Sequence, residues 1–240
     1  MFNTFFYHPL YNLLMWFVDA LPNNDAGIAV VCLTLLVSVA LLSISKKAIK
    51  TQLALKVIEP ELLKIKNEIT NKEEQARQTL AIYKKYKVNP FSMMALVIIQ
   101  IPILLALFYA FRGLPAIDTE ALYSFVKAPP AVNMMFFGVF DIGQRSIVMA
   151  VIAGVTQFIQ AYIVTSYKQK PKVADDAKKT MQEQFAHSMQ TQMKYVLPVV
   201  IGFISAGLPA ALPLYWSVRN VFTSFQELAV RKKGVTLNKN

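Results

Sequence analysis

The chain has 240 residues, of which 55% are hydrophobic and 16% are charged, and its mean hydropathy is +0.41. This composition is too apolar for a soluble domain of this size, so it predicts an integral membrane protein. The formal net charge is +11. Lys and Arg gather in the cytoplasmic loops of membrane proteins, beside anionic lipid. The basic charge therefore needs no nucleic-acid partner, and no nucleic-acid specificity is expected.

The N-terminal segment contains an aromatic stretch, FFYHPLYNLLMWFVDAL at residues 5–21, which has no Lys or Arg and is followed by Pro22. It lacks the basic region and the cleavage pattern of a signal peptide. A sixth membrane span is one alternative for this stretch. It would leave PNNDAG as the only turn before the next span, so we predict instead a helix lying in the outer membrane interface.

Three uncharged runs, 27–45, 91–111 and 146–167, are each long enough to cross a hydrocarbon core of about 30 Å as a helix. A fourth apolar region, 195–230, is too long for one span and is interrupted by GLPAALP. Proline at this place favours a turn and a new helix start. The fourth region is therefore predicted to form two spans joined by a tight hairpin, which makes five spans in all.

The basic residues are unevenly distributed along the chain. Residues 46–90 hold 11 of them, residues 168–194 hold 6 and residues 230–240 hold 4, which is 21 of the 25 Lys and Arg. Because basic loops stay on the cytoplasmic side, five spans with the N-terminus outside and the C-terminus inside satisfy all three segments. The predicted organisation is an outer N-terminus (1–26), span 1 (27–45), a cytoplasmic insert (46–90), span 2 (91–111), an outer loop (112–145), span 3 (146–167), a cytoplasmic loop (168–194), span 4 (195–208), span 5 (210–229) and a basic cytoplasmic tail (230–240).

The cytoplasmic insert is rich in charge and in good helix formers. Its apolar residues recur near helical period in two groups, separated by ITNKEE. Thr70 and Glu73 in this break have the spacing of a capping box that opens a second helix. The pattern predicts an antiparallel helical hairpin with few apolar residues for docking, and hence mobile relative to the membrane core. A hairpin of this kind is either a contact surface, which we favour, or a connecting loop that happens to be helical.

A charged residue, Arg219, lies within the last predicted span. A guanidinium at the bilayer centre costs a few kcal/mol on insertion scales, so it must face protein or water. Arg219 is ten residues after Pro209, near mid-depth, which disfavours snorkelling to the interface. The predicted spans offer no Asp or Glu at matching depth, and Glu227 lies two turns further toward the cytoplasm. Arg219 is therefore predicted to face a polar interior. Gln100 and Gln157 either line that interior or form interhelical hydrogen bonds.

The sequence gives no sign of catalysis. The single cysteine, Cys32, cannot form an intramolecular disulfide, and both histidines, His8 and His187, lie outside the predicted spans. An intramembrane protease would need a nucleophile and its base at membrane depth, and phosphate loops and zinc spacings are also missing. We expect no enzyme activity, no catalytic residues, no cofactor and no metal. A small solute transporter or channel that uses the buried arginine is the main alternative, but the inverted repeats that would favour it are not visible.

Several motifs follow one another in order from about residue 8 to residue 229: HPLYNLLMWF, LTLLV, EPELLKIKNE, LAIYKKYKVNPF, IIQIPILLALFYAFR, GVFDIG, AGVTQFIQ, MKYVLPVV and GLPAALPLYWSVRNVFTSFQE. Together they resemble the membrane protein insertases typified by bacterial YidC, which have relatives in mitochondria and thylakoids. The resemblance implies an all-α fold of five transmembrane helices around a polar groove, with an N-terminal interfacial helix and a cytoplasmic helical hairpin. It also implies a protein of the bacterial cytoplasmic (inner) membrane that inserts client proteins and helps them fold.

The resemblance further implies how the site is organised. The groove opens to the cytoplasm and to lipid, it receives the polar tail of a client, and the client's apolar segment slides along the outside of the bundle. Family members usually carry an arginine four residues after the threonine of LTLLV, where this chain has Ser38. We therefore expect Arg219 to replace that cation. The residues expected to line the groove are Arg219, Thr34, Ser38, Gln100 and Gln157, and those expected to form the slide are Leu104, Ala153, Ile204, Tyr215 and Trp216.

The expected partners follow from the same resemblance. They are nascent membrane-protein clients and the lipid bilayer, with the ribosome and a Sec-type translocon as further candidates. The basic tail RKKGVTLNKN is a weak ribosome-binding candidate, and it is better explained as a topology anchor.

Overall fold

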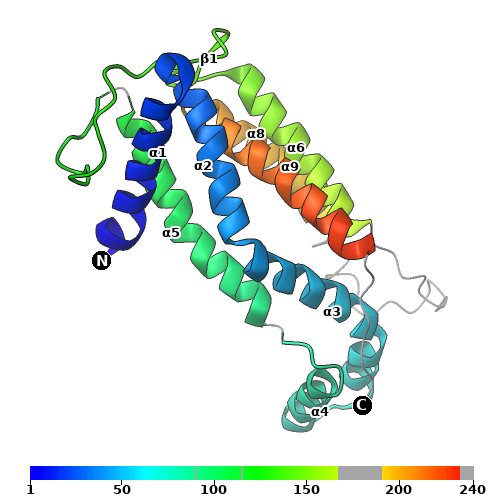
Figure 1. The fold of residues 1–240 in the computed structure, drawn as a ribbon. Helices are drawn as coiled ribbons and strands as arrows, with labels where there is room; N and C mark the ends of the chain where they lie inside the picture. Colours follow the sequence, from blue (N-terminus) through cyan, green and yellow to red (C-terminus); the bar gives the residue numbers. More distant parts are fainter. Residues whose placement is uncertain (90, 115, 167–190, 233–240) are drawn as a thin grey trace.

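The structure is a computed structural model, and it describes residues 1–89, 91–114, 116–166 and 191–232. Most of the predicted cytoplasmic loop 168–194 and of the predicted tail 230–240 lies outside these residues. Figure 1 shows an elongated bundle of helices. The helices are η1 (Asn3–Tyr7), α1 (His8–Ala20), η2 (Pro22–Asn24), α2 (Ala26–Ala40), α3 (Leu42–Glu68), α4 (Lys72–Lys85), α5 (Phe91–Gly113), α6 (Ile147–Thr165), η4 (Gln192–Val196), α8 (Leu197–Ala206) and α9 (Ala211–Lys232), and two short strands are β1 (Met135–Phe136) and β2 (Phe140–Asp141).

Helix α1 presents one apolar face to the bundle. Its buried residues Tyr11, Leu14, Met15 and Val18 follow the i, i+3, i+4, i+7 spacing of one helical face. This face packs against α2 and α5. The predicted helix at 5–21 is thus present as η1 and α1, whereas its place in a membrane interface stays a prediction.

The helix that begins at Ala26 is sharply bent at Leu41. Helices α2 and α3 meet there at an angle of 62°. The uncharged run 27–45 is therefore not one straight helix, because its last four residues belong to α3. Because of the bend, the charged sequence after Lys46 does not continue along the axis of α2. Such a change of direction is expected where a chain leaves the hydrocarbon layer.

Helices α3 and α4 lie against each other at the lower end of the molecule (Figure 1). Asn71 caps α4, because its Oδ1 accepts hydrogen bonds from the backbone N–H groups of Glu73 (2.9 Å) and Glu74 (3.3 Å). The capping box predicted at Thr70 is therefore wrong: Asn71 provides the cap one residue later, and the two glutamates complement the dipole of the first turn.

The base of α3 is docked rather than free. Ile49 and Leu53 of α3 form a buried cluster with Val230 of α9. The insert was expected to have few apolar residues for docking, and in this cluster it uses two, Ile49 and Leu53. Mobility of the outer part of α3 and of α4 stays a prediction.

Helices α6, α8 and α9 pack side by side (Figure 1). The approach of α6 to α8 depends on small residues: a Cβ added to Gly154 would lie 3.4 Å from the Pro198 carbonyl oxygen and 3.6 Å from the Gly202 Cα. Small residues let membrane helices pack closely, which replaces the hydrophobic driving force that lipid does not supply. The turn between α8 and α9 holds only residues 207–210, as the predicted hairpin requires.

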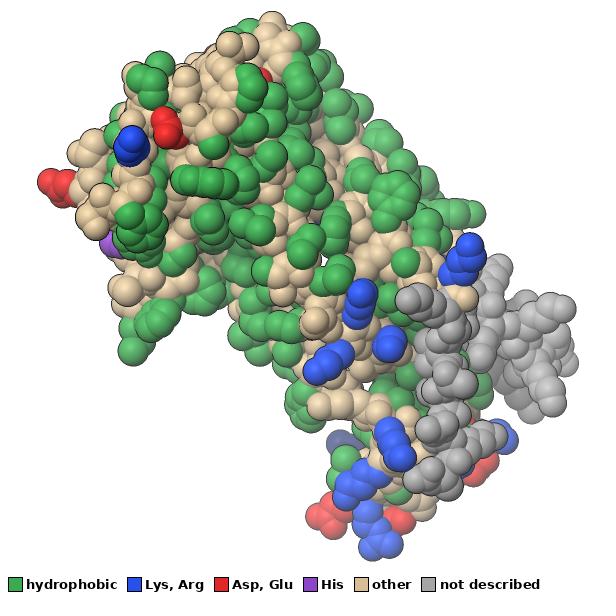
Figure 2. All heavy atoms as spheres, viewed as in Figure 1, with side chains coloured by type: hydrophobic (Ala, Val, Ile, Leu, Met, Phe, Trp, Pro, Cys, Tyr) green, Lys and Arg blue, Asp and Glu red, His purple; other side chains and the backbone are tan. Residues whose placement is uncertain are grey.

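The apolar character of the helices supports a membrane protein. By length and composition, two of the described helices, Met94–Gly113 and Ile147–Thr165, are able to cross a membrane, or three if the bent pair α2 and α3 counts as one span. Figure 2 shows hydrophobic side chains over most of the visible face of the bundle, while most Lys and Arg side chains gather at the lower end over α3 and α4. The count of five spans stays a prediction.

Residues 116–145, most of the segment predicted to be the outer loop, lie at the other end of the bundle (Figure 1). Strands β1 and β2 pair antiparallel around a turn at Gly138, whose φ is +70°. Asp25 joins this turn to α2: its Oδ1 accepts from Ile28 N (2.9 Å) and its Oδ2 accepts from Phe137 N (3.0 Å). Gly27 permits the contact, since a Cβ there would lie 2.3 Å from the Phe136 ring.

Candidate client groove

Arg219 lies on α9 and is half-buried. Its guanidinium interacts with the hydroxyl of Tyr215, one turn earlier on the same helix. The ion pairs found among the described residues do not include Arg219. The residue is therefore a partly desolvated cation held beside a neutral hydroxyl, which leaves its charge available to an incoming anion.

Tyr215 connects Arg219 to helix α5. Gln100 Nε2 donates a hydrogen bond of 2.8 Å to the Tyr215 hydroxyl, and Tyr215 is only 1% exposed. The other amide atom, Gln100 Oε1, is buried without a hydrogen-bond partner among the described residues. Buried polar atoms are normally paired, so Gln100 offers an acceptor to a polar group that enters beside Tyr215.

Two further predicted groove residues lie on α2, a helix that packs against α9. Thr34 and Ser38 are both buried, and each hydroxyl donates to the carbonyl four residues earlier: Thr34 to Val30 (2.6 Å) and Ser38 to Thr34 (2.7 Å). These bonds satisfy the two hydroxyls within their own helix. In the described part of the chain, no hydrogen bond joins either hydroxyl to Arg219.

Helix α6 contributes a weaker polar connection. Asn220 Nδ2 lies 3.5 Å from Thr156 Oγ1, which links α9 to α6 next to Arg219. Gln157 is half-buried and its Nε2 lies 3.4 Å from Gln160 Oε1 on the same helix. The structure thus joins Arg219, Tyr215 and Gln100 through polar contacts, whereas the hydrogen bonds of Thr34, Ser38 and Gln157 to other described residues stay within their own helices.

The residues expected to form the slide are not all on the surface. Ile204 is 48% exposed, and Leu104 and Trp216 are half-buried. Ala153 and Tyr215, in contrast, are fully buried, so they lie inside the bundle. Successive residues of a helix point about 100° apart, so Tyr215 and the neighbouring Trp216 face different directions, and the Gln100 contact fixes Tyr215 inward.

A second polar layer lies near the basic end of the bundle. Ser45 Oγ donates to Gln226 Oε1 (3.0 Å), and Gln226 Nε2 donates to the Leu42 carbonyl (3.3 Å) beside the bend at Leu41. Next to Gln226, Glu227 is buried and pairs with Arg231, 2.9 Å away. Sequence reasoning placed no function here. The one signal was the i, i+4 spacing of Glu227 and Arg231, which is common on exposed helices as well.

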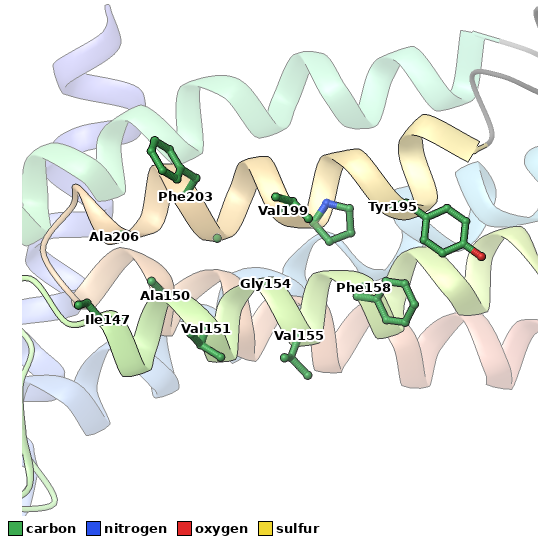
Figure 3. Close-up of a pocket in the computed structure, with 12 residues that line it drawn as sticks. Ile147, Ala150, Val151, Gly154, Val155, Phe158, Tyr195, Val199, Phe203 and Ala206 are labelled. Carbon is green, nitrogen blue, oxygen red and sulfur yellow. The ribbon is translucent and has the colours of Figure 1, made fainter.

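An open apolar groove of about 710 Å³ runs between α6 and α8 (Figure 3). Val151, Val155 and Phe158 line it from α6, and Val199 and Phe203 line it from α8. Its floor is the close contact of Gly154 with Gly202. Such a surface binds acyl chains or the apolar part of a protein helix, and it offers no chemistry for a polar ligand.

The polar and apolar parts of the site are therefore separated. Polar side chains of α5, α6 and α9 point into the bundle, and apolar side chains of α6 and α8 face outward. Among the residues that the structure describes, no three His, Cys, Asp or Glu side chains are grouped as metal ligands. The arrangement is suited to holding a chain that has one polar and one apolar segment.

Comparison with known proteins identifies the family. The chain matches the family described as 60Kd inner membrane protein over residues 16–237. Membrane protein insertase YidC of Oceanobacillus iheyensis is 28% identical over 96% of this chain and 83% of its own length. Membrane protein insertase YidC 2 of Listeria monocytogenes is 30% identical over 96% and 77%, and membrane protein insertase MisCA of Bacillus subtilis is 26% identical over 97% and 79%. Because the match covers residues 16–237, this chain belongs to the 60Kd inner membrane protein family, the family of the YidC-type membrane protein insertases.

Proposed function

We propose that this chain inserts client proteins through a polar groove inside the bundle, with Arg219 as the cation of that groove. The observation that carries the proposal is the position of Arg219: it is half-buried on α9, beside the buried Tyr215–Gln100 pair, and outside the ion pairs of the described residues. An uncompensated cation in a partly desolvated site is expensive to maintain, so it indicates a functional use.

The physical task of the groove is to lower the desolvation cost of a polar segment that crosses the membrane. A polar group moved into hydrocarbon without a hydrogen-bond partner loses several kcal/mol. Gln100 Oε1, Tyr215 and Arg219 supply replacement partners on one side of the bundle. The membrane potential and the hydrophobicity of the client then drive the transfer, so no covalent step and no cofactor are required.

The apolar part of the client needs a different surface. We propose that it follows Leu104, Ile204 and Trp216, whose side chains remain at least partly exposed. Ala153 and Tyr215 are too deeply buried to take part without rearrangement of the bundle. Insertion then consists of two coupled movements, with the polar tail inside the bundle and the apolar segment outside it.

We propose five spans with the N-terminus outside and the C-terminus inside, in the bacterial cytoplasmic membrane. The concentration of Lys and Arg over α3 and α4 supports this orientation, because basic segments stay on the cytoplasmic side (Figure 2). The same basic surface is suited to the acidic surface of a ribosome, and a Sec-type translocon is a second candidate partner. A small solute transporter is disfavoured, because the family match extends over nearly the whole chain.

Crosslinking of a stalled client tests the groove. Cys32 is replaced by Ala, and single cysteines are placed at Arg219 in the proposed groove, at Ile204 on the proposed slide and at Phe225 as a control on the exposed face of α9. A nascent single-span client with one cysteine in its polar tail should react with position 219 and not with position 225. A client cysteine in the apolar segment should react with position 204. Equal reaction of the polar tail with positions 219 and 225 would exclude an internal path.

A further inference from the structure

Two cations from different helices meet at the carboxyl end of α6. Lys56 Nζ, from α3, donates a hydrogen bond of 2.7 Å to the Val164 carbonyl, and Arg231 Nη2, from α9, donates one of 3.0 Å to the same oxygen. Val164 lies in the last turn of α6, where carbonyls have no partner within the helix. Cations are favourable at this end of a helix dipole, so the contact joins α3, α6 and α9 at one point.

The two cations are not held equally. Arg231 is fixed by Glu227, which is 1% exposed and accepts from Arg231 Nε at 3.0 Å. Lys56 is half-buried, and its hydrogen bond in the described part of the chain is the one to the neutral Val164 carbonyl. Burial lowers the pKa of Lys56, the charge of Arg231 lowers it further, and Glu227 and Glu59 act in the opposite direction. Among the described residues, no carboxylate forms an ion pair with Lys56.

Helix α3 is fixed at its first turn. This turn follows the 62° bend at Leu41, and Gln226 of α9 holds it through hydrogen bonds to Leu42 and Ser45. Further along, Ile49 and Leu53 dock on Val230. Lys56, three residues after Leu53, is the next point of attachment, through its bond to Val164 of α6. Helix α3 also packs against α5, so the Lys56 bond is one of several contacts that hold this helix, and its loss is expected to loosen the part of α3 beyond Lys56 while the first turn stays in place.

We propose that Lys56 is a latch residue that holds α3 against the end of α6 and that a carboxylate on the cytoplasmic segment of a client releases it. The inference rests on the proposed function, because it assumes that a client enters the bundle from the basic end. A carboxylate is a stronger partner for an ammonium group than a neutral carbonyl is, because the attraction between opposite charges adds to the hydrogen bond. An acidic client segment therefore competes with Val164 for Lys56 and allows α3 to move away, whereas a neutral segment does not.

The test measures the distance between α3 and α6. Spin labels are attached to cysteines at the exposed positions Lys64 and Ile159 in a Cys32→Ala protein held in lipid nanodiscs. The unmodified latch should give one narrow distance distribution. Lys56→Met should add longer distances, because it keeps the apolar stem and removes the donor. Lys56→Arg should restore the narrow distribution, since a guanidinium also reaches the carbonyl. The matched control is Lys50→Met, which removes an exposed charge from the same helix.

A pair of client peptides tests the release. The two peptides share one apolar segment and differ only in the tail, which carries Asp and Glu in one and Asn and Gln in the other. The acidic peptide should shift the unmodified protein to the distribution of Lys56→Met, and the neutral peptide should leave it unchanged. Identical distributions for Lys56→Met and the unmodified protein would overturn the latch, and equal responses to both peptides would overturn release by charge.

The outcome is separable from that of the proposed groove. The effect of Lys56→Met on the distance needs no client, so it is expected even in an Arg219→Ala protein. If the client tail did not crosslink to position 219 while the distance still changed, the groove would be wrong and the latch itself would stand. If the client tail crosslinked to position 219 and the distance between α3 and α6 did not change, the groove would be supported and the latch would be wrong.

Discussion

The Gln100 side chain of α5 and the Tyr215 hydroxyl of α9 share a hydrogen bond of 2.8 Å inside the bundle, although 115 residues separate them in the sequence. This bond fixes Tyr215 inward and places a polar contact directly beside Arg219. It also connects two of the helices that were expected to enclose the groove. The contribution of this hydrogen bond to the free energy of unfolding is therefore a direct test of the contact.

Tyr215→Phe should destabilise the protein by about 1–3 kcal/mol, because it leaves the buried Gln100 amide without its partner. Gln100→Leu combined with Tyr215→Phe should cost less than the sum of the two single changes, since both polar groups are then gone. Unfolding in detergent micelles, followed by circular dichroism, measures both effects. If the losses of unfolding free energy in the two single variants added up to that of the double variant, the bond would contribute nothing to stability.

Arg219→Ala should slow insertion of clients with acidic translocated tails by about tenfold or more, because a hydrogen bond to a charged group contributes about 1.5–3 kcal/mol. Clients with neutral tails should be affected much less. Insertion into proteoliposomes, followed by protease protection of the tail, provides the rates.

Two further variants serve as a control and as a rescue for Arg219→Ala. Arg145→Ala removes an exposed arginine from the outer loop and should leave both rates unchanged. Ser38→Arg added to Arg219→Ala should restore part of the rate. Because α2 packs against α9, an arginine at position 38 returns a cation to the same interior. Unchanged insertion of acidic tails by Arg219→Ala would make Arg219 a structural residue.

Glu227→Gln should destabilise the protein strongly, by about 3–5 kcal/mol, because it removes the charge of one member of a buried ion pair. The Arg231 side chain is only 14% exposed. The control is Glu74→Gln on α4, where the paired Arg77 side chain is 83% exposed, and a pair of this kind contributes less than about 1 kcal/mol. Equal losses of unfolding free energy in the two variants would contradict the burial argument.

Cysteine labelling tests the proposed orientation of the chain in the membrane. In a Cys32→Ala background, a cysteine at position 127 should react with an impermeant maleimide added outside intact cells, and a cysteine at position 78 should react only after the membrane is opened. The physical reason is that residues 46–90 carry 11 basic side chains, which favour the cytoplasmic side, while residue 127 belongs to the proposed outer loop. The reverse labelling pattern would rule out the proposed orientation.

The sequence by itself determined the class of protein, because that depends on local properties. Runs of uncharged residues predict helices in lipid wherever they occur, and α5 and α6 begin and end within three residues of the runs that predicted them. The cation of Arg219 was also visible locally, as one charge in an apolar stretch. The clustering of basic residues predicted the charged end seen over α3 and α4 in the same way (Figure 2).

Only the tertiary structure decided which polar groups meet. Asn71 rather than Thr70 caps α4, because the cap depends on the backbone dihedral angles at the helix start. Tyr215 turned inward because Gln100 lies opposite to it on another helix. Lys56 was one charged residue among many in its segment, and its partner is a backbone carbonyl 108 residues away. Every residue carries such a carbonyl, so no residue type marks it in the sequence, and only the position of Lys56 beside the end of α6 in the folded chain selects it.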